Sequence, residues 1–487
     1  MLTLPSEIFL GVIMLSKKEL VSKSVEELAP LIEKREVSSV ELTEAVLEHA
    51  EKLNGEINAY VSFRRKKALE EAEKADAEIA SGNYRGMYHG IPMAIKDNIY
   101  VKDEVTTMSS KIHRDFVSDY DATAVKKMKE AGIVLTGKLN MHEYAWGITN
   151  NSPHFGPVKN PWNLKKAPGG SSGGSGAAVA ADMTVATLGT DTAGSIRIPS
   201  SACGIVGLKP TYGLVSKYGV YPLAWSLDHI GPMTKTVKDA AGLLEVLAGF
   251  DKNDPTSVDV PVEKYTEQVK GDVKGLVIGI EEDFFFNRVD ATVEKLVRDA
   301  IQQLADLGAK VEPVKIPALK YAEYAELVTS LSEASAIHHR DLLARPDDFG
   351  DDIRMLFELG ELFTAVDYLQ AQQLRRQIKQ DFEKAFAHID VLIAPTLPIV
   401  MPDIGDDLVD LNGEKVDLVE NTIRFTGPAN LTGLPALSVP CGFKGDMPVG
   451  LQIIGPAFKE GTLLNVGYAI EQTNPLKGKK PEILVSN

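Results

Sequence analysis

The 487-residue sequence predicts an α/β protein. Two observations carry this prediction. Leu276–Ile280 reads as a strand, a helical stripe of apolar residues follows it up to Gly308, and a second strand starts at Val311. Further along, apolar segments at 391–395, 436–440 and 449–454 return strands to the sheet. A chain of this length can hold one large domain or two to three average ones.

Composition limits the functional classes. The sequence is 44% hydrophobic and 25% charged, as in an ordinary globular protein. Its formal net charge of −16 argues against nucleic acid or an anionic membrane as the main partner. Two cysteines, Cys203 and Cys441, form neither a disulfide framework nor a zinc site, so we expect a cytoplasmic protein. We expect no metal and no cofactor, since no His/Cys/Asp cluster has ligand spacing.

Residues 1–15 are predicted to be an N-terminal extension. The apolar patch there is interrupted by Glu7, lacks a basic segment before it and is too short to span a bilayer. Met14 is an alternative start for the chain. No other stretch is apolar for long enough to cross a membrane, so we expect no membrane partner.

Residues 16–85 are predicted to form a helical layer. Two capping boxes, Ser24-x-x-Glu27 and Ser38-x-x-Glu41, each open an amphipathic stretch, and a charged run follows at 64–80.

A strand is expected next, over Ile91–Val101, and it contains Lys96. A lysine in a strand usually faces solvent, but Met93-Ala94-Ile95 and Ile99 indicate a strand covered on both faces. Such cover would desolvate the amine, lower its pKa and make it a plausible base.

The segment from Gly169 to Ser200 contains two glycine- and serine-rich turns around a short apolar unit, Ala177–Leu188. Such turns let backbone N–H groups converge on an anion. A flexible linker is the alternative, but linkers are not usually followed by Ala-Ala-Val-Ala-Ala. A phosphate-binding Walker loop is excluded because Ala177, not Lys, follows Gly176.

A nucleophile elbow G-x-S-x-G aligns at 169–173, with Ser171 at its centre. It would belong to an α/β-hydrolase with His229, His338, His339 or His388 as base. That alternative requires a strand before Gly169, where residues 160–168 read as loop. His142-Glu143 is half of an H-E-x-x-H zinc motif, but residue 146 is Trp.

The two turns and the lysine strand resemble the amidase signature family, the Ser–cisSer–Lys serine amidases, from about residue 24 to about residue 472. The resemblance implies one domain over 16–487, with a mixed central β-sheet, helices on both faces and a mainly helical cap at 310–390. Residues 86–240 would be the catalytic core, with Ser195 as nucleophile, Ser171 as bridging serine and Lys96 as base.

The same resemblance assigns supporting roles. The backbone N–H groups of Thr192, Ala193, Gly194 and Ser195 would form the oxyanion hole. Asp191 and Arg197 would hold the turn in shape by pairing. Four side chains are candidates for the substrate pocket, although the aromatic ones could equally be core residues: Met108, Trp146, Tyr221 and Trp225.

The reaction implied is hydrolysis of a carboxamide to a carboxylate and an amine or ammonia through an acyl-enzyme, with esters as a second substrate class. Residues 365–376 and 424–430 look like those of stand-alone amidases. We therefore expect a stand-alone enzyme with a small-molecule amide substrate and no nucleic acid, a homodimer being one option. The alternative is the glutaminase A chain of an aspartyl/glutamyl-tRNA amidotransferase. A non-catalytic partner in a larger complex is disfavoured because Lys96, Ser171 and Ser195 are all present.

Overall fold

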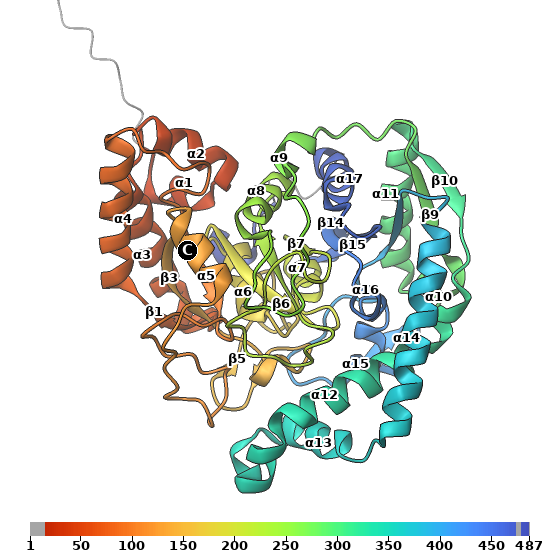
Figure 1. Ribbon diagram of the computed structural model, residues 1–487. Helices are drawn as coiled ribbons and strands as arrows, with labels where there is room; N and C mark the ends of the chain where they lie inside the picture. The colour runs from red at the N-terminus through yellow and green to blue at the C-terminus, as the bar shows by residue number, and fades with distance from the viewer. Residues whose placement is uncertain (1–14, 474–478, 487) are drawn as a thin grey trace, which may run out of the picture.

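The computed structural model describes residues 15–473 and 479–486. The predicted extension at 1–15, except residue 15, and the alternative start at Met14 lie outside these residues. Eleven strands form one central sheet (Figure 1): β1 (Tyr60–Phe63), β2 (Pro92–Lys96), β3 (Val134–Leu139), β6 (Ala186–Asp191), β7 (Val206–Lys209), β8 (His229–Thr234), β9 (Val277–Ile280), β10 (Lys310–Pro313), β11 (Val391–Pro395), β14 (Ala436–Lys444) and β15 (Met447–Ile454).

The sheet is mixed, and its order is β1-β3-β2-β6-β8-β7-β14-β15-β11-β9-β10. Strand β2 runs parallel to both of its neighbours, β3 and β6, whereas β6 and β8 are antiparallel. The antiparallel hairpin β14–β15 lies between β7 and β11. Two small ribbons lie outside this sheet, β4 (Asn151–Ser152) with β5 (Gly156–Pro157) and β12 (Leu408–Leu411) with β13 (Glu414–Asp417). The predicted single α/β domain with a mixed sheet is confirmed.

Helices flank this sheet, as Figure 1 shows. Those described are α1 (Lys17–Ser22), α2 (Val25–Glu33), α3 (Ser39–Ile57), α4 (Arg65–Ala80), α5 (Thr123–Glu130), α6 (Gly173–Ala180), α7 (Arg197–Cys203), α8 (Val237–Leu247), α9 (Tyr265–Gln268), α10 (Glu282–Phe285), α11 (Ala291–Asp306), α12 (Ala322–Ala344), α13 (Asp351–Gly360), α14 (Ala365–Ala385), α15 (Leu418–Ile423), α16 (Gly427–Thr432), α17 (Glu460–Thr473) and α18 (Glu482–Ser486). Both predicted capping boxes are present, at the starts of α2 and α3.

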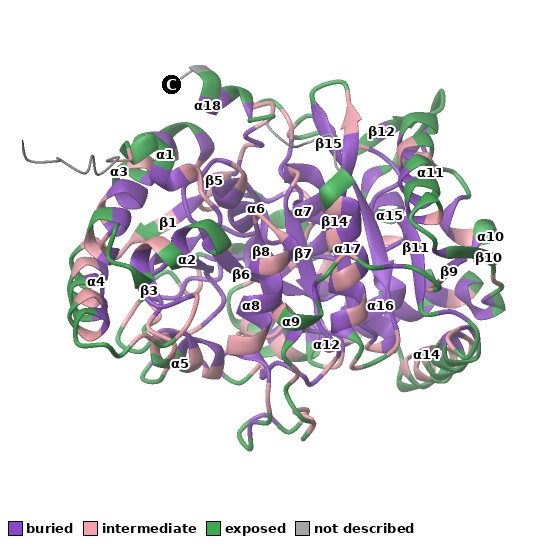
Figure 2. Cartoon of the chain, turned by 90° about the horizontal axis from the view of Figure 1, so that it is seen from above, coloured by how far each residue is buried: buried purple, intermediate pink, exposed green. Residues whose placement is uncertain are grey.

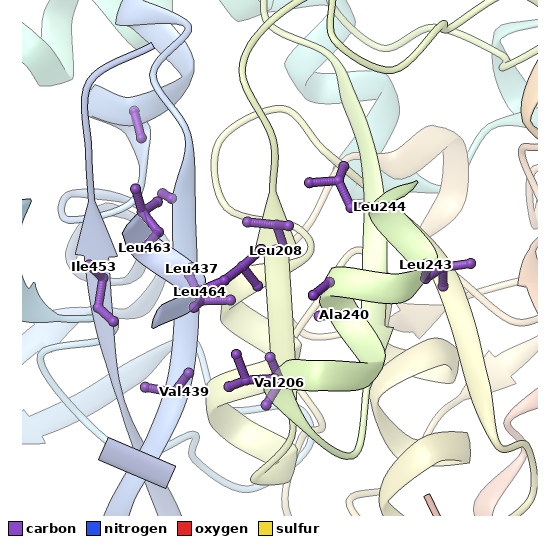
Figure 3. Packing of buried hydrophobic residues seen from close by; sticks show 14 of the residues in the cluster. Val206, Leu208, Ala240, Leu243, Leu244, Leu437, Val439, Ile453, Leu463 and Leu464 are labelled. Atoms are coloured by element: carbon purple, nitrogen blue, oxygen red, sulfur yellow. The ribbon is translucent and has the colours of Figure 1, made fainter. Parts of the chain in front are cut away.

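One face of the sheet packs on apolar helices. Val206 and Leu208 of β7 point toward α8 and α17, where Leu244 and Leu464 belong to the same buried cluster (Figure 3). Burial in Figure 2 follows this pattern: the central strands are buried, and the outward sides of α4 and α14 are exposed.

The opposite face is covered closely by α7. A Cβ at Gly207 of β7 would lie 2.1 Å from Ser200 Oγ, and one at Gly450 of β15 would lie 2.6 Å from Ser201 Oγ. Both positions therefore require glycine so that α7 can rest on the strands. Because α7 begins at Arg197, this packing fixes the turn that contains Ser195 against the sheet.

Two expected elements differ in extent. The strand predicted over Ile91–Val101 ends at Lys96, since Asp97 and Asn98 turn the chain away. Within the mainly helical cap expected at 310–390, residues 351–385 form two helices, because α13 ends at Gly360 and Thr364 caps the start of α14. Figure 1 shows α12, α13 and α14 together at one side of the sheet, where α12 packs on both of the others. Over the described residues, no helix combines the length and the apolar character needed to cross a membrane.

Candidate active site

Lys96 ends the buried strand β2, and its amine has two hydroxyl partners. Nζ donates to Ser171 Oγ and to Thr190 Oγ1, each at 2.8 Å. Burial lowers the pKa of Lys96 to about 7, although the carboxylates of Asp191 and Asp228 act in the opposite direction. A large fraction of this amine is therefore neutral near pH 7 and can accept a proton.

The two serine turns are held against each other. Ser172 N–H donates to the carbonyl of Ser195 at 3.3 Å, and Ser172 Oγ donates to the carbonyl of Thr190 at 3.2 Å. The peptide bond between Gly170 and Ser171 is cis. Lys96 and Ser171 are fully buried, whereas Ser195 is 8% exposed and lines a cavity. Ser195 is therefore the member of this group that a substrate can reach.

The buried side chains of Asp191 and Arg197 stabilise the second turn, which contains Ser195. The Asp191 carboxylate accepts hydrogen bonds from Gly194 N–H at 2.8 Å and from Arg197 Nε at 3.0 Å. Arg197 also donates to Asn430 Oδ1 at 2.7 Å and to Gln452 Oε1 at 3.1 Å. Burial raises the pKa of Asp191, but the Arg197 guanidinium outweighs it and holds that pKa far below its usual range. The carboxylate is therefore ionised and serves as an anchor.

The predicted oxyanion hole needs one correction. The N–H of Gly194 points to Asp191 Oδ1, so it is not free to bind an oxyanion. Within the described part of the chain, the N–H groups of Thr192, Ala193 and Ser195 have no hydrogen-bond acceptor. These three are the available donors. Gly194 has a structural task instead: its φ is +132°, and a Cβ there would lie 2.3 Å from Thr426 Oγ1.

A cavity of about 500 Å³ opens beside Ser195. Of the four predicted pocket residues only Trp146 lines it. Met108 is fully buried in a core cluster against which Tyr221 packs. Trp225 is 47% exposed and borders a different surface pocket. A larger cavity of about 830 Å³ lies between α14 and α16 and includes none of the site residues.

The histidine alternative finds no support in this geometry. Residues 158–172, all of them described, contain no strand, so Ser171 is not on a strand-to-helix elbow. His229 Nδ1 contacts the carbonyl of Leu227, and the His338 ring stacks on Phe357. His339 contacts Glu361. Across the described residues, no three His, Cys, Asp or Glu side chains are grouped as metal ligands would be.

Several residues of the site were missed from the sequence. Thr190 shares the Lys96 amine with Ser171, and Asn98 donates to the same threonine hydroxyl at 3.2 Å. Only the positions of these two residues in the sequence could have indicated a role in the site. Asn98 lies two residues after Lys96, and Thr190 directly precedes Asp191. Asn430 and Gln452 come from distant segments and carry no local signal.

The chain is similar to known proteins over nearly its whole length. Residues 41–464 match the family model described as Amidase. The A chain of glutamyl-tRNA(Gln) amidotransferase from Carboxydothermus hydrogenoformans is 41% identical, over 96% of this chain and 100% of the relative. The crystal structure of the corresponding A chain from Thermotoga maritima superposes with a TM-score of 0.78 at 36% identity, covering 98% of this chain and 100% of that one. A crystal structure of an amidase gives a TM-score of 0.85 at 34% identity, covering 93% and 100%.

These relatives contradict two predictions. The expected stand-alone amidase is wrong, because the curated relatives that match over the full length are A chains of amidotransferases. The two segments that favoured it, 365–376 and 424–430, are short beside an alignment of 489 residues. The expected absence of nucleic acid and of a partner chain is wrong for the same reason. The net charge is a sum over the whole protein and does not describe the charge of any one binding surface.

Proposed function

The chain belongs to the amidase family of C–N hydrolases, and we propose that it is the A chain of a glutamyl-tRNA(Gln) amidotransferase. In this role it would hydrolyse the side-chain amide of glutamine and supply the ammonia that converts glutamyl-tRNA(Gln) to glutaminyl-tRNA(Gln). The observation that carries the proposal is the 41% identity to such chains over their full length.

The proposed nucleophile is Ser195, because it is the serine of the group that lines the cavity. Its Oγ would attack the amide carbonyl carbon of glutamine while its proton passes to Ser171. Ser171 would in turn pass its own proton to the neutral amine of Lys96, 2.8 Å away. The lowered pKa of Lys96 supports this direction of transfer.

The negative charge of the tetrahedral intermediate would be stabilised by the N–H groups of Thr192, Ala193 and Ser195. Collapse of the intermediate would break the C–N bond, with the proton returned from Lys96 through Ser171 to the leaving nitrogen. Ammonia would then depart, and a glutamyl ester would remain on Ser195. Water, activated by the same relay, would hydrolyse this ester and release glutamate.

The proposed partners are the other chains of the amidotransferase, together with glutamyl-tRNA(Gln). This role would place the protein in the cytoplasm, where tRNA is charged. The chain itself would perform the hydrolytic half of the reaction, and a partner chain would use the ammonia.

The test is to follow the amide nitrogen. The purified chain is incubated with glutamine labelled with ¹⁵N in its side chain, alone and together with the other amidotransferase chains encoded in the same genome, glutamyl-tRNA(Gln) and ATP, whose phosphoryl group activates the glutamyl carboxylate for attack by ammonia. We expect ¹⁵N-ammonia in both cases and ¹⁵N in the glutaminyl-tRNA only when the other chains are present. Failure to release ammonia from glutamine under both conditions would refute the proposal.

A further inference from the structure

The cavity beside Ser195 contains a buried carboxyl group that the reaction does not use. Glu326, on α12, lines this cavity and is only 5% exposed. The other acidic residues along the cavity, Asp352, Asp407 and Asp417, are exposed to solvent. None of the described residues that line the cavity is a lysine or an arginine.

Glu326 forms no ion pair with any of the described residues, in contrast to the buried Asp191. Asp191 pairs with Arg197, and Glu333 on the same helix accepts hydrogen bonds from Ser226 and Tyr368. Among the described residues, the side chain that interacts with the Glu326 carboxyl is that of Ser330, one turn later, whose hydroxyl donates to the backbone carbonyl of Glu326 at 2.8 Å.

The burial of this unpaired carboxyl group lowers the stability of the folded protein. Burial raises the pKa of Glu326 to about 7, and the hydrogen bond from Ser330 opposes this only in part. A buried carboxyl without a cation costs free energy that a glutamine or leucine at this position would avoid. A ligand that carries a positive charge would remove this cost and leave the carboxylate ionised.

We propose that Glu326 binds an ammonium group on the acyl part of the amide substrate, so that the cavity selects amides that carry a positive charge there. For glutamine, on which this step rests through the proposed function, the group is the α-ammonium. The cavity offers no lysine or arginine to the α-carboxylate among the described residues that line it. Recognition therefore depends on the amine of the substrate far more than on its acid.

Four amide substrates distinguish the contribution of the ammonium group from that of the carboxylate. Glutamine has both charges, 4-aminobutanamide has the ammonium alone, 4-carbamoylbutanoate has the carboxylate alone, and butanamide has neither. In the native protein we expect removal of the ammonium to lower kcat/KM by about 10- to 100-fold, the effect of one hydrogen-bonded charge. Removal of the carboxylate should change it far less. In Glu326→Gln, which keeps the shape of the side chain, the ammonium effect should fall to about threefold or less.

The matched control is Glu323→Gln. Glu323 lies on the same helix, one turn earlier, and is not among the residues that line the cavity. It should keep the full preference for amines. Labelling of Ser195 with a fluorophosphonate reports whether each variant is folded with an accessible nucleophile.

The outcomes separate this inference from the proposed function. If 4-aminobutanamide is hydrolysed faster than butanamide in a Glu326-dependent way but glutamine is not hydrolysed, the inference holds and the proposed function fails. If glutamine is hydrolysed but 4-carbamoylbutanoate is equally good, or Glu326→Gln keeps the amine preference, the inference is overturned and the function stands. Hydrolysis of none of the four by a protein labelled at Ser195 overturns both.

Discussion

Arg197 and Asp191 form an ion pair at 3.0 Å in which neither side chain is exposed to solvent. The carboxylate also accepts the N–H of Gly194, directly before Ser195. The pair thus determines the path of the backbone on which the proposed nucleophile is presented.

We predict that Arg197→Met lowers the free energy of unfolding by about 3–5 kcal/mol, because it leaves the buried charge of Asp191 without its partner. Urea denaturation measures this. The control is Asp283→Asn, which removes an exposed ion pair with Lys315 and should leave the free energy of unfolding nearly unchanged. Equal effects of the two substitutions would contradict a structural role for the buried pair.

Amide hydrolysis should rise with pH through about 7 and stay high at alkaline pH, because Lys96 accepts a proton only when neutral. An ordinary histidine titrates near ~6.5, so the midpoint alone does not identify the base. Lys96→Arg stays charged and should be as inactive as Lys96→Ala, at least about 10²-fold below the native protein. Alanine at His229, His338, His339 or His388 should leave the acidic limb in place. Near-normal turnover of Lys96→Arg would exclude lysine as the base.

The two serines should differ in their response to alanine. Ser195→Ala should abolish both hydrolysis and labelling by a fluorophosphonate, since it removes the attacking oxygen. Ser171→Ala should slow turnover yet leave Ser195 available for slow labelling. Peptide mapping of the labelled native protein identifies the modified residue. A label on Ser171 would favour the nucleophile elbow instead.

Lys96→Met should stabilise the protein near neutral pH while it destroys activity. The folded-state pKa of Lys96, about 7, is below its ordinary value, so the unfolded chain binds more protons between pH 7 and about 10.5. Below pH 7 the native protein therefore bears the full free-energy cost of burying the charged Lys96 amine. It becomes more stable as the pH rises above 7. We expect the variant to be more stable than the native protein at pH 7, with the difference shrinking toward pH 10. A difference that grew with pH would contradict burial of a neutral amine.

Gly194→Ala should both destabilise the protein and abolish activity. The added Cβ would meet the side chain of Thr426, at a φ of +132° that side chains rarely adopt. The matched control is Gly55→Ala in α3, where a Cβ meets nothing within 4 Å and the substitution should stabilise by up to about 1 kcal/mol. Thermal unfolding compares the two, and a neutral Gly194→Ala would show that the turn can relax.

The elements that could be predicted from the sequence are those marked by patterns of residues close together in the chain. Capping boxes at Ser24 and Ser38 place helix starts, because their partners lie three residues away. The strand with Lys96 was recognisable from its apolar neighbours. The contact of Lys96 with Thr190 spans 94 residues and depends on β2 lying beside β6, which no pattern in the chain specifies.

The cavity was beyond prediction for a similar reason. Trp225 and Tyr221 were candidates because they are aromatic and near a motif, yet neither of them lines the cavity beside Ser195. Glu326 sits on an amphipathic helix, where an acid usually faces water. That it faces the cavity follows from the packing of α12 on α16 and α13, which only the tertiary structure determines.

The partners of Arg197 have a consequence for synthesis of the chain. Asn430 and Gln452 follow Arg197 by 233 and 255 residues. At the usual rates of translation this is a delay of about 10 to 50 s after the serines have been made. A nascent chain that has emerged through β8 holds Lys96, Ser171 and Ser195 but lacks the side chains that complete the anchor. Because the β14–β15 hairpin must first enter the sheet beside β7, we expect the proposed hydrolytic activity to begin only with the nearly finished polypeptide.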